Sequence, residues 1–184
     1  MISKQPASGA SVSPTAIARV LRETPEGLRV FCAAVDPSLL AWSPAPGEWS
    51  IGQLLGQLLG HLLDADEHAF AQRIRWMLDN PGGTIPRWSA ALAAEARGSG
   101  DDPLALLAEL AERRIGRAAF VAGLTPAQLA VGAHFPDRGE FLVSDFVVEW
   151  AWHDWDHTKQ VMEILKQSAW GGFSEGMQKA LAGG

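Results

Sequence analysis

Two histidines four residues apart are the side chains of this sequence best suited to chemistry. His153 and His157 lie in the run WAWHDWDH, residues 150–157, within a segment of helical apolar periodicity. Side chains four apart project from successive turns on one side of a helix, so the two imidazoles can close on one ion. At 100° per residue both lie on the apolar face expected to meet the core, where imidazoles without partners are costly. The pair predicts a metal site that needs a third ligand from elsewhere.

His61 is the candidate for that ligand, because it lies on a second strongly helical segment and carboxylates follow it. His68 lies on nearly the same face but about 10 Å further along the axis, so one ion cannot easily take both. It is the reserve candidate. His134 lies among proline, glycine and charged residues in the stretch 132–140 and ranks last.

The ligand set indicates which cations fit. Three neutral imidazoles with an open position suit zinc, nickel, cobalt, copper or ferrous iron, and suit calcium or magnesium poorly. Three protein ligands with a position left open are typical of catalytic rather than structural zinc. We therefore expect a divalent transition metal, with zinc or nickel preferred, that activates a bound water or an incoming thiol.

Carboxylates close to the histidines are the candidate catalytic groups. Glu149 lies one turn before His153, and Asp64 lies one turn after His61. Glu149 could orient a ligand or act as a general base, and Asp64 could support a ligand by a hydrogen bond or be a fourth ligand. The other polar neighbours are expected to be solvated or to line a pocket: Asp154, Asp156, Gln57 and Gln160.

Capping signals and apolar periodicity predict four long helices and no strand. Ser50 with Gln53 forms a capping-box signature, and Asp102-Pro103 supplies an N-cap and a first helical residue. We expect helices over about 14–35, with a break or kink near Thr24, and over about 51–79, 103–122 and 143–167. A short helical piece begins at Thr125-Pro126, and 132–140 is expected to be an irregular loop. The prediction is an all-α four-helix bundle with a long crossover connection between helices 2 and 3, over about 80–102.

Composition favours one soluble domain in the cytoplasm. We expect a flexible leader over 1–13 and a single domain over 14–184. The net charge of -6 argues against a nucleic-acid surface, which needs clustered lysine and arginine. The uncharged run Ile51–Leu63 is too short to cross a bilayer, so no membrane partner is expected. Cys32 is the only cysteine, which excludes an intramolecular disulfide and allows a reducing compartment.

A second apolar line on two of the helices predicts a homodimer. On the last helix it lies opposite the histidines, and on the second helix it lies opposite or nearly opposite His61. Either the C-terminal segment with Trp170 and Phe173 or a second copy of the chain is expected to cover it. The residues of the two lines are Val148, Trp152, Trp155 and Met162, and Leu59, Leu63, Phe70 and Met77.

Three stretches carry a resemblance to a known family. They are GEWSI at 47–51 leading into GHLLDAD at 60–66, the pair Arg113-Arg114, and HDWDHTKQ at 153–160. With these motifs the chain resembles the DinB/YfiT-like superfamily of metalloenzymes. The resemblance implies a four-helix bundle whose second and last long helices are neighbours. It also implies a divalent metal held by His61, His153 and His157.

The resemblance also implies a class of function. The leading hypothesis is a metal-dependent transferase that joins a low-molecular-weight thiol to a small-molecule electrophile. The alternatives are a metal-hydroxide hydrolase and a non-catalytic, stress-related protein that binds a metal or small ligand. A di-iron bundle needs a Glu-x-x-His motif on each of two helices, and haem attachment needs Cys-x-x-Cys-His. The sequence contains neither pattern.

Overall fold

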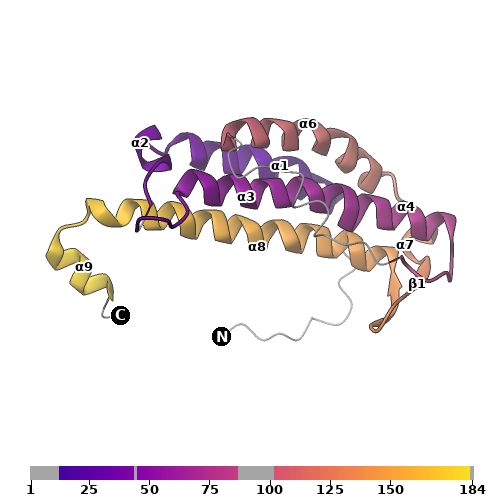
Figure 1. Ribbon diagram of the computed structural model, residues 1–184. Coiled ribbons are helices and arrows are strands. Elements are labelled where there is room, and N and C mark those ends of the chain that lie inside the picture. The colour runs from indigo at the N-terminus through magenta and orange to yellow at the C-terminus, as the bar shows by residue number, and fades with distance from the viewer. Residues whose placement is uncertain (1–12, 44, 87–101, 183–184) are drawn as a thin grey trace.

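Four long helices form the body of the protein, as the sequence predicts (Figure 1). The computed structural model describes residues 13–43, 45–86 and 102–182, so the predicted leader up to residue 12 and the part of the crossover over 87–101 lie outside the described residues. The long helical elements are α1 (Pro14–Ala33), α3 (Ile51–Asp64) continued by η1 (Ala65–Ala71) and α4 (Gln72–Asp79), α6 (Pro103–Ala122) and α8 (Val143–Ala169). The shorter ones are α2 (Pro37–Leu40), α7 (Pro126–Leu129), the 3-10 turn η2 (Trp170–Gly172) and α9 (Glu175–Ala182).

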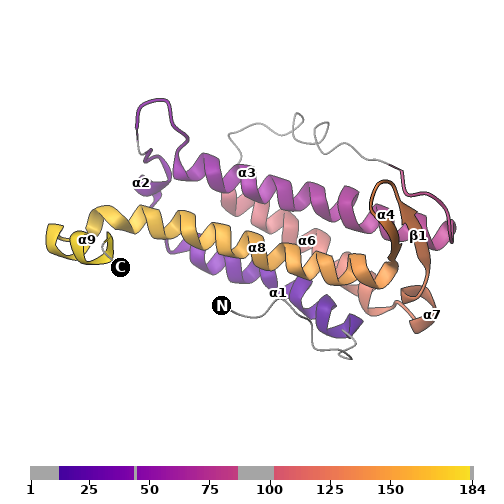
Figure 2. The same ribbon diagram turned by 90° about the horizontal axis from the view of Figure 1, so that it is seen from below.

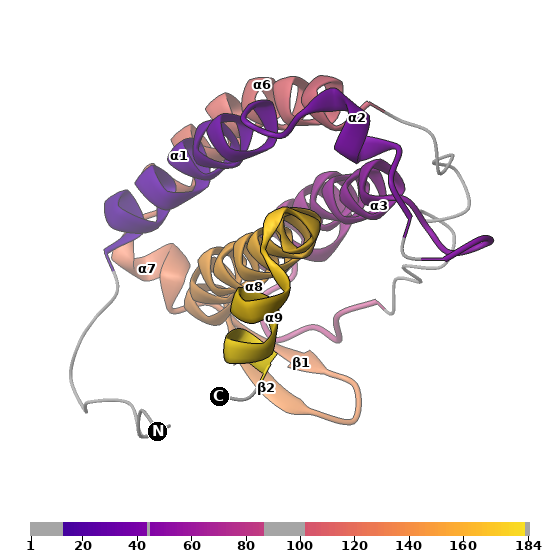
Figure 3. The same ribbon diagram turned by 90° about the vertical axis from the view of Figure 1, so that its left-hand side faces the viewer.

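The four helices surround the core in the order α1, α6, α3, α8, and each packs against two neighbours (Figure 3). α3 and α6 run in the same direction: Leu55 and Leu107, near their beginnings, share one buried cluster, whereas Met77 and Val121, near the ends of α4 and α6, share another. The end of α4 and the beginning of α6 therefore lie toward opposite ends of the bundle (Figure 2). This confirms the predicted crossover, and it makes α3 and α8 neighbours.

The predicted helix starts are confirmed at their caps. The Ser50 hydroxyl accepts from the backbone N–H of Gln53, whose side chain accepts from the backbone N–H of Ser50. The Asp102 carboxylate accepts from the N–H of Leu104, with Pro103 at the first helical position. Each cap satisfies backbone donors that have no partner within the helix, which fixes where the chain enters the bundle.

The prediction of no strand was wrong. A hairpin of β1 (Gly132–Phe135) and β2 (Gly139–Leu142) leads into α8. Each strand has only four residues, too few for a clear alternation, and the segment is rich in the residues that also mark loops. The turn places Asp137 at φ 64° and Gly139 at φ 95°. Tertiary packing stabilises the strands, because Phe135 and Phe141 pack against the core ring of Phe146.

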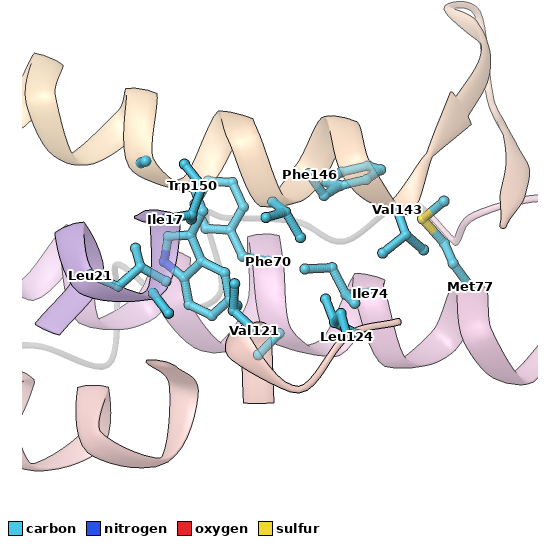
Figure 4. Packing of buried hydrophobic residues seen from close by; sticks show 14 of the residues in the cluster. Ile17, Leu21, Phe70, Ile74, Met77, Val121, Leu124, Val143, Phe146 and Trp150 are labelled. Carbon is cyan, nitrogen blue, oxygen red and sulfur yellow. The ribbon is translucent and has the colours of Figure 1, made fainter. Parts of the chain in front are cut away.

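The second long helix is not one regular α-helix. Residues Ala65–Ala71 form a π-helical turn between α3 and α4, where the N–H of Gln72 bonds the carbonyl of Glu67, five residues earlier. Such turns are rare and frequently lie at functional sites. This one comes four residues after His61 and contains buried Asp66 and Phe70, and Phe70 stacks on Trp150 of α8 with ring centroids 5.2 Å apart (Figure 4).

Arg114 of α6 is buried at the centre of the bundle, where it joins all four long helices. Its Nε and Nη2 donate to Asp66 at 2.5 and 2.7 Å, and its Nη1 and Nη2 donate to Asp154 at 2.6 and 2.8 Å. Nη1 also donates to the Leu21 carbonyl of α1 at 3.0 Å. A guanidinium has five N–H donors, and these bonds use all of them.

The Leu21 carbonyl is available because of a proline. Pro25 lies inside α1, which continues through it to Ala33. Pro25 has no N–H, so it cannot bond the carbonyl four residues earlier, which is that of Leu21. Arg114 supplies the missing donor, while the Thr24 hydroxyl donates to the Val20 carbonyl at 2.9 Å. The pair Thr24-Pro25 thus lies within α1 rather than ending it.

Replacing Arg114 by Met should destabilise the protein by about 3–5 kcal/mol, because two carboxylates would stay buried without their cation. The matched control is Arg113→Met: Arg113 is 41% exposed and pairs with Glu109 on the same helix, so its loss should cost at most about 1 kcal/mol. Urea unfolding monitored by circular dichroism measures both changes. Equal effects of the two substitutions would contradict a central role for Arg114.

Candidate metal centre

Three imidazoles from two helices meet at one point beside the core. His61 of α3 has its Nε2 3.2 Å from the Nε2 of His153, and the Nε2 of His157 is 3.0 Å from that same atom. Within the described parts of the chain, these three residues form a group whose potential ligand atoms all lie within 4.8 Å of one another. The structure thus brings together the three histidines that the sequence singles out.

Neighbouring side chains fix how the rings are turned. The Nδ1–H of His157 donates to Oε1 of Gln160 at 2.9 Å, in the tautomer that leaves a lone pair on Nε2 facing His153. The His153 ring packs with its edge toward Phe70, at 5.3 Å between centroids, and Phe70 is held by Trp150. The three Nε2 atoms are therefore presented together on one side.

The surroundings of His153 and His61 favour their uncharged forms. Burial lowers the pKa of His153 to about 3, and the neighbouring charges of His157, His61 and Arg114 act in the same direction. Burial, followed by the charge of His157, also lowers the pKa of His61, against a raising effect from Asp64. Neutral imidazole is the form that binds a metal.

The geometry fits a transition metal. With Zn–N bonds of 2.0–2.1 Å, two nitrogens of a tetrahedral site lie about 3.3 Å apart, close to the separations of 3.2 and 3.0 Å. Because His157 presents a lone pair at Nε2, the Nε2 of His153 can hydrogen-bond to it only as a donor and cannot then accept from His61, whereas one cation could bind all three nitrogens. The residues present therefore suit a divalent metal with nitrogen ligands.

The histidines lie at the edge of the core face rather than at its centre, which corrects the sequence prediction. His153 and His157 are half-buried and His61 is exposed. The buried line of α8 passes instead through Val147, Trp150, Asp154 and Val161. The predicted core face is centred on the histidines, whereas Asp154, predicted to be solvated or to line a pocket, belongs to the buried line. A cation at the edge of the core keeps access to solvent.

The two predicted helper carboxylates do not join the three-histidine group. Asp64 is half-buried, and its charge raises the pKa of His61, so it lies close to that ring. Glu149 is exposed, and its charge acts on Arg73. The remaining histidines also lie apart: His68 contacts Gln72, and His134 contacts Glu140 across the hairpin.

Sequence reasoning missed the polar residues that support the site. Asp66 and Asp154 are buried on Arg114, and the indole N–H of Trp150 also donates to Asp66 at 2.8 Å. One signal could have identified Arg114, because its position continues the apolar stripe of Leu107, Leu110, Ala118 and Val121 on α6. An arginine on such a stripe requires buried anions. Asp154 follows His153 directly, so the network anchors the turn of α8 that carries it.

A groove with a volume of about 770 Å³ opens beside His61, between α3 and α8. Its apolar lining consists of Leu54, Leu58 and Ile164, all half-buried. Gln57 and Gln160 line it, as the sequence suggested, together with the exposed charged residues Asp156, Lys159 and Glu163. The site therefore has a space for a small molecule next to the histidines.

Comparisons with known proteins agree with this fold. A family model described as the DinB superfamily matches residues 21–161. No curated protein matches the sequence significantly. Among solved structures, YfiT from Bacillus subtilis, titled a probable metal-dependent hydrolase with an unusual four-helix bundle topology, superposes with a TM-score of 0.67 at 21% identity, covering 92% of this chain and 94% of that one.

Two further structures share the fold at lower similarity. A DinB-like protein of Bacillus subtilis, YjoA, has a TM-score of 0.50 at 13% identity, with 87% of this chain and 94% of that one covered. A mycothiol-dependent maleylpyruvate isomerase has a TM-score of 0.51 at 13% identity, with 86% and 68% covered. At these identities the likeness describes the fold.

None of the helices within the described ranges is long and apolar enough to span a membrane.

The metal-free protein should lose stability as the pH falls from about 7 toward 4. His153 has an ordinary pKa of 6.5 when unfolded and about 3 when folded, so between these values the unfolded chain binds more protons. After a discount for partial exposure, the share of His153 between pH 7 and pH 5 is roughly 1 kcal/mol. Urea unfolding of chelator-treated protein at both pH values measures it.

His153→Gln should reduce the difference in unfolding free energy between pH 7 and pH 5 by roughly 1 kcal/mol. The control is His134→Gln, on the exposed hairpin, which should leave the slope as in the parent protein. A parent slope that persists in His153→Gln would contradict the neutral, crowded state of the ring.

Proposed function

The chain belongs to the DinB superfamily, and from this premise we propose that it is a divalent-metal-dependent enzyme, most specifically a thiol-dependent transferase acting on a small electrophile. The observation that carries the proposal is the convergence of the Nε2 atoms of His61, His153 and His157. We assign these residues as the metal ligands, with zinc or nickel as the preferred ion.

A catalytic rather than structural metal fits the surroundings better. Structural zinc sites close all four positions with protein groups, whereas catalytic sites keep one open. Here three histidines form the group within the described residues, and a groove lies beside His61. The bundle also has two buried apolar clusters of its own, so the fold does not depend on an ion to hold it together.

The residues divide the work of the site. A bound divalent cation would supply Lewis acidity, which favours the deprotonated form of a thiol or water. Gln160 holds His157 in the tautomer that presents Nε2, and the contact of Phe70 holds the His153 ring. Asp154 on Arg114 fixes the turn of α8 beside them. The groove would orient the small-molecule substrate.

A general base for hydrolysis would have to come from outside the three-histidine group, where Asp64 lies close to His61. Hydrolysis depends on a positioned base that takes a proton from water. Within the described residues the close group holds three histidines, and Asp64 and Glu149 lie outside it. A thiol brings a more acidic nucleophile of its own. The related structures are compatible with both reaction classes, since one is titled a probable metal-dependent hydrolase and another a mycothiol-dependent maleylpyruvate isomerase.

Metal content tests the ligand assignment. Protein purified without an affinity tag should contain near-stoichiometric metal by elemental analysis. Each of His61→Ala, His153→Ala and His157→Ala should lose most of it, because removing one ligand of three leaves too few. The controls are His68→Ala and His134→Ala, which should keep it. Retained metal in the first three variants would show that the ion binds elsewhere.

Activity then separates the reaction classes. The metal-loaded protein should conjugate a chlorodinitrobenzene with one of bacillithiol, mycothiol, glutathione or coenzyme A, and His153→Ala should not. Asp64→Asn and Glu149→Gln are assayed alongside, as tests of the two predicted helpers. Turnover of ester or amide panels without any thiol would favour the hydrolase. If the metal-bound protein is inactive in both the thiol conjugation and the hydrolysis assays, a non-catalytic binding protein is favoured.

We also propose that two copies form a homodimer through the outer face of α8 and the C-terminal segment that contains η2 and α9. Trp152 is 62% exposed and Trp155 is 54% exposed on that face. α9 does not cover them, and its own apolar residues Met177 and Leu181 are exposed as well. Exposed apolar surface of this kind usually marks an interface. The corresponding line on α3 needs no second cover, because Leu59 and Leu63 face the bundle core.

Light scattering after size exclusion tests the dimer. The parent protein should have about twice the chain mass of 19.7 kDa, and Trp155→Glu should shift it to the monomer because the charge would be buried at the interface. Ile115→Glu is the control, since Ile115 is 67% exposed on α6 and lies outside the proposed surface. A parent protein that elutes as a monomer at all concentrations would overturn the proposal.

A further inference from the structure

The lining of the groove beside His61 changes from histidine at one end to apolar residues at the other. On α3 its lining runs from His61 back to Leu54, and on α8 it runs from Asp156 to Ile164. His61 pairs with His153 on α8, so the histidines lie at one end and Leu54 and Ile164 lie at the other. Seven residues of α-helix separate His61 from Leu54, a length of roughly 10 Å.

The floor of this groove is apolar, and its margins are polar. Leu58 and Ile164 are half-buried and pack against the buried cluster at this end of the bundle, so their outer surfaces form the floor. Gln57 and the charged residues of α8 that line the groove are exposed. An apolar body lying on the floor would cover these side chains from water, which is a favourable contribution to binding.

The charges at the margins favour an uncharged body. Asp156 and Glu163 carry negative charges, Lys159 carries a positive charge, and Lys166 pairs with Glu163 at 3.6 Å, so the margin on α8 has no net charge. The indole N–H of Trp152 donates to Asp156 at 3.1 Å, which holds that carboxylate in place. A charged far end would lose water over the apolar floor without a net attraction at the margin to compensate.

On these grounds we propose that the substrate of the metal centre is a linear amphiphile whose metal-binding head lies at the three histidines and whose uncharged apolar body, roughly 10 Å long, lies on Leu58, Leu54 and Ile164. This inference rests on the proposed function, since the head group requires the metal. It adds a substrate class: acyl or alkyl compounds of medium chain length, in preference to compact polar electrophiles.

Hydroxamates of different length test the inference, because they all present the same metal-binding head. Octanohydroxamate should bind the metal-loaded protein at least about tenfold more tightly than acetohydroxamate, since its tail would cover the groove floor. The monohydroxamate of suberic acid, of equal length with a carboxylate at its far end, should bind more weakly than octanohydroxamate. Titration calorimetry measures the three affinities.

Substitutions in the groove provide the second arm. Leu58→Glu should reduce the gain from the tail to about twofold or less while leaving the affinity for acetohydroxamate unchanged. Ile164→Glu, on the opposite helix, should do the same and remains available if the first variant does not fold. Leu104→Glu is the control, because Leu104 is an exposed leucine of α6 outside the groove.

The outcomes separate the two proposals. If acetohydroxamate binds but octanohydroxamate gains nothing, the metal centre stands and the amphiphile inference is overturned, as it would be if another segment or copy covered the groove. If the suberic acid derivative binds most tightly, the uncharged body is wrong. If none of the hydroxamates binds, both the metal centre and the inference fail.

Discussion

The buried guanidinium of Arg114 is the interaction on which the rest of this structure depends. It binds Asp66 at the π-helical turn, Asp154 on α8 and the Leu21 carbonyl on α1, and it belongs to α6 itself. The two carboxylates raise its pKa, so it stays charged despite burial. A charge at this depth is costly unless every donor has a partner, and this requirement fixes the four helices relative to one another. Shape complementarity of leucines alone would allow them to slide.

This network also explains how a site at the edge of the core can be held in place. The histidines are too exposed for packing alone to fix them, and His61 comes from a different helix than the other two. Asp154 follows His153 in sequence, and Asp66 lies five residues after His61 in the same helical run. Each half of the candidate metal centre is thus tied to the same guanidinium. Because the buried network fixes the helical turns that carry the histidines, the rings can face solvent and keep their positions relative to one another. This is the condition for a preformed ligand set.

The elements that the sequence predicted best are those governed by local rules. Ser50 with Gln53 and Asp102 with Pro103 marked helix starts that the structure confirms, and the histidine spacing identified the residues that meet. The elements it predicted poorly depend on contacts between distant segments. The hairpin strands of four residues rest on Phe146 and on a bridge between Thr84 and His134, and no local pattern reports such contacts. The π-helical turn contains no proline or glycine from which the sequence could have predicted it. Arg114, in contrast, was visible in principle, because a cation on an apolar stripe demands anions elsewhere.

The same reasoning accounts for the asymmetry of the candidate centre. On its inner side lie two carboxylates and one guanidinium, a net formal charge of -1, together with the stacked rings of Phe70 and Trp150. On its outer side lies the groove between α3 and α8. Of these three inner groups, Arg114 is the one whose charge lowers the pKa of His153, so the network favours the neutral form of that ring. The carboxylates of Asp66 and Asp154 cannot turn toward the histidines, because Arg114 engages each of them with paired hydrogen bonds, so they stay outside the ligand set. The groove is therefore the side from which a small molecule could reach the histidines.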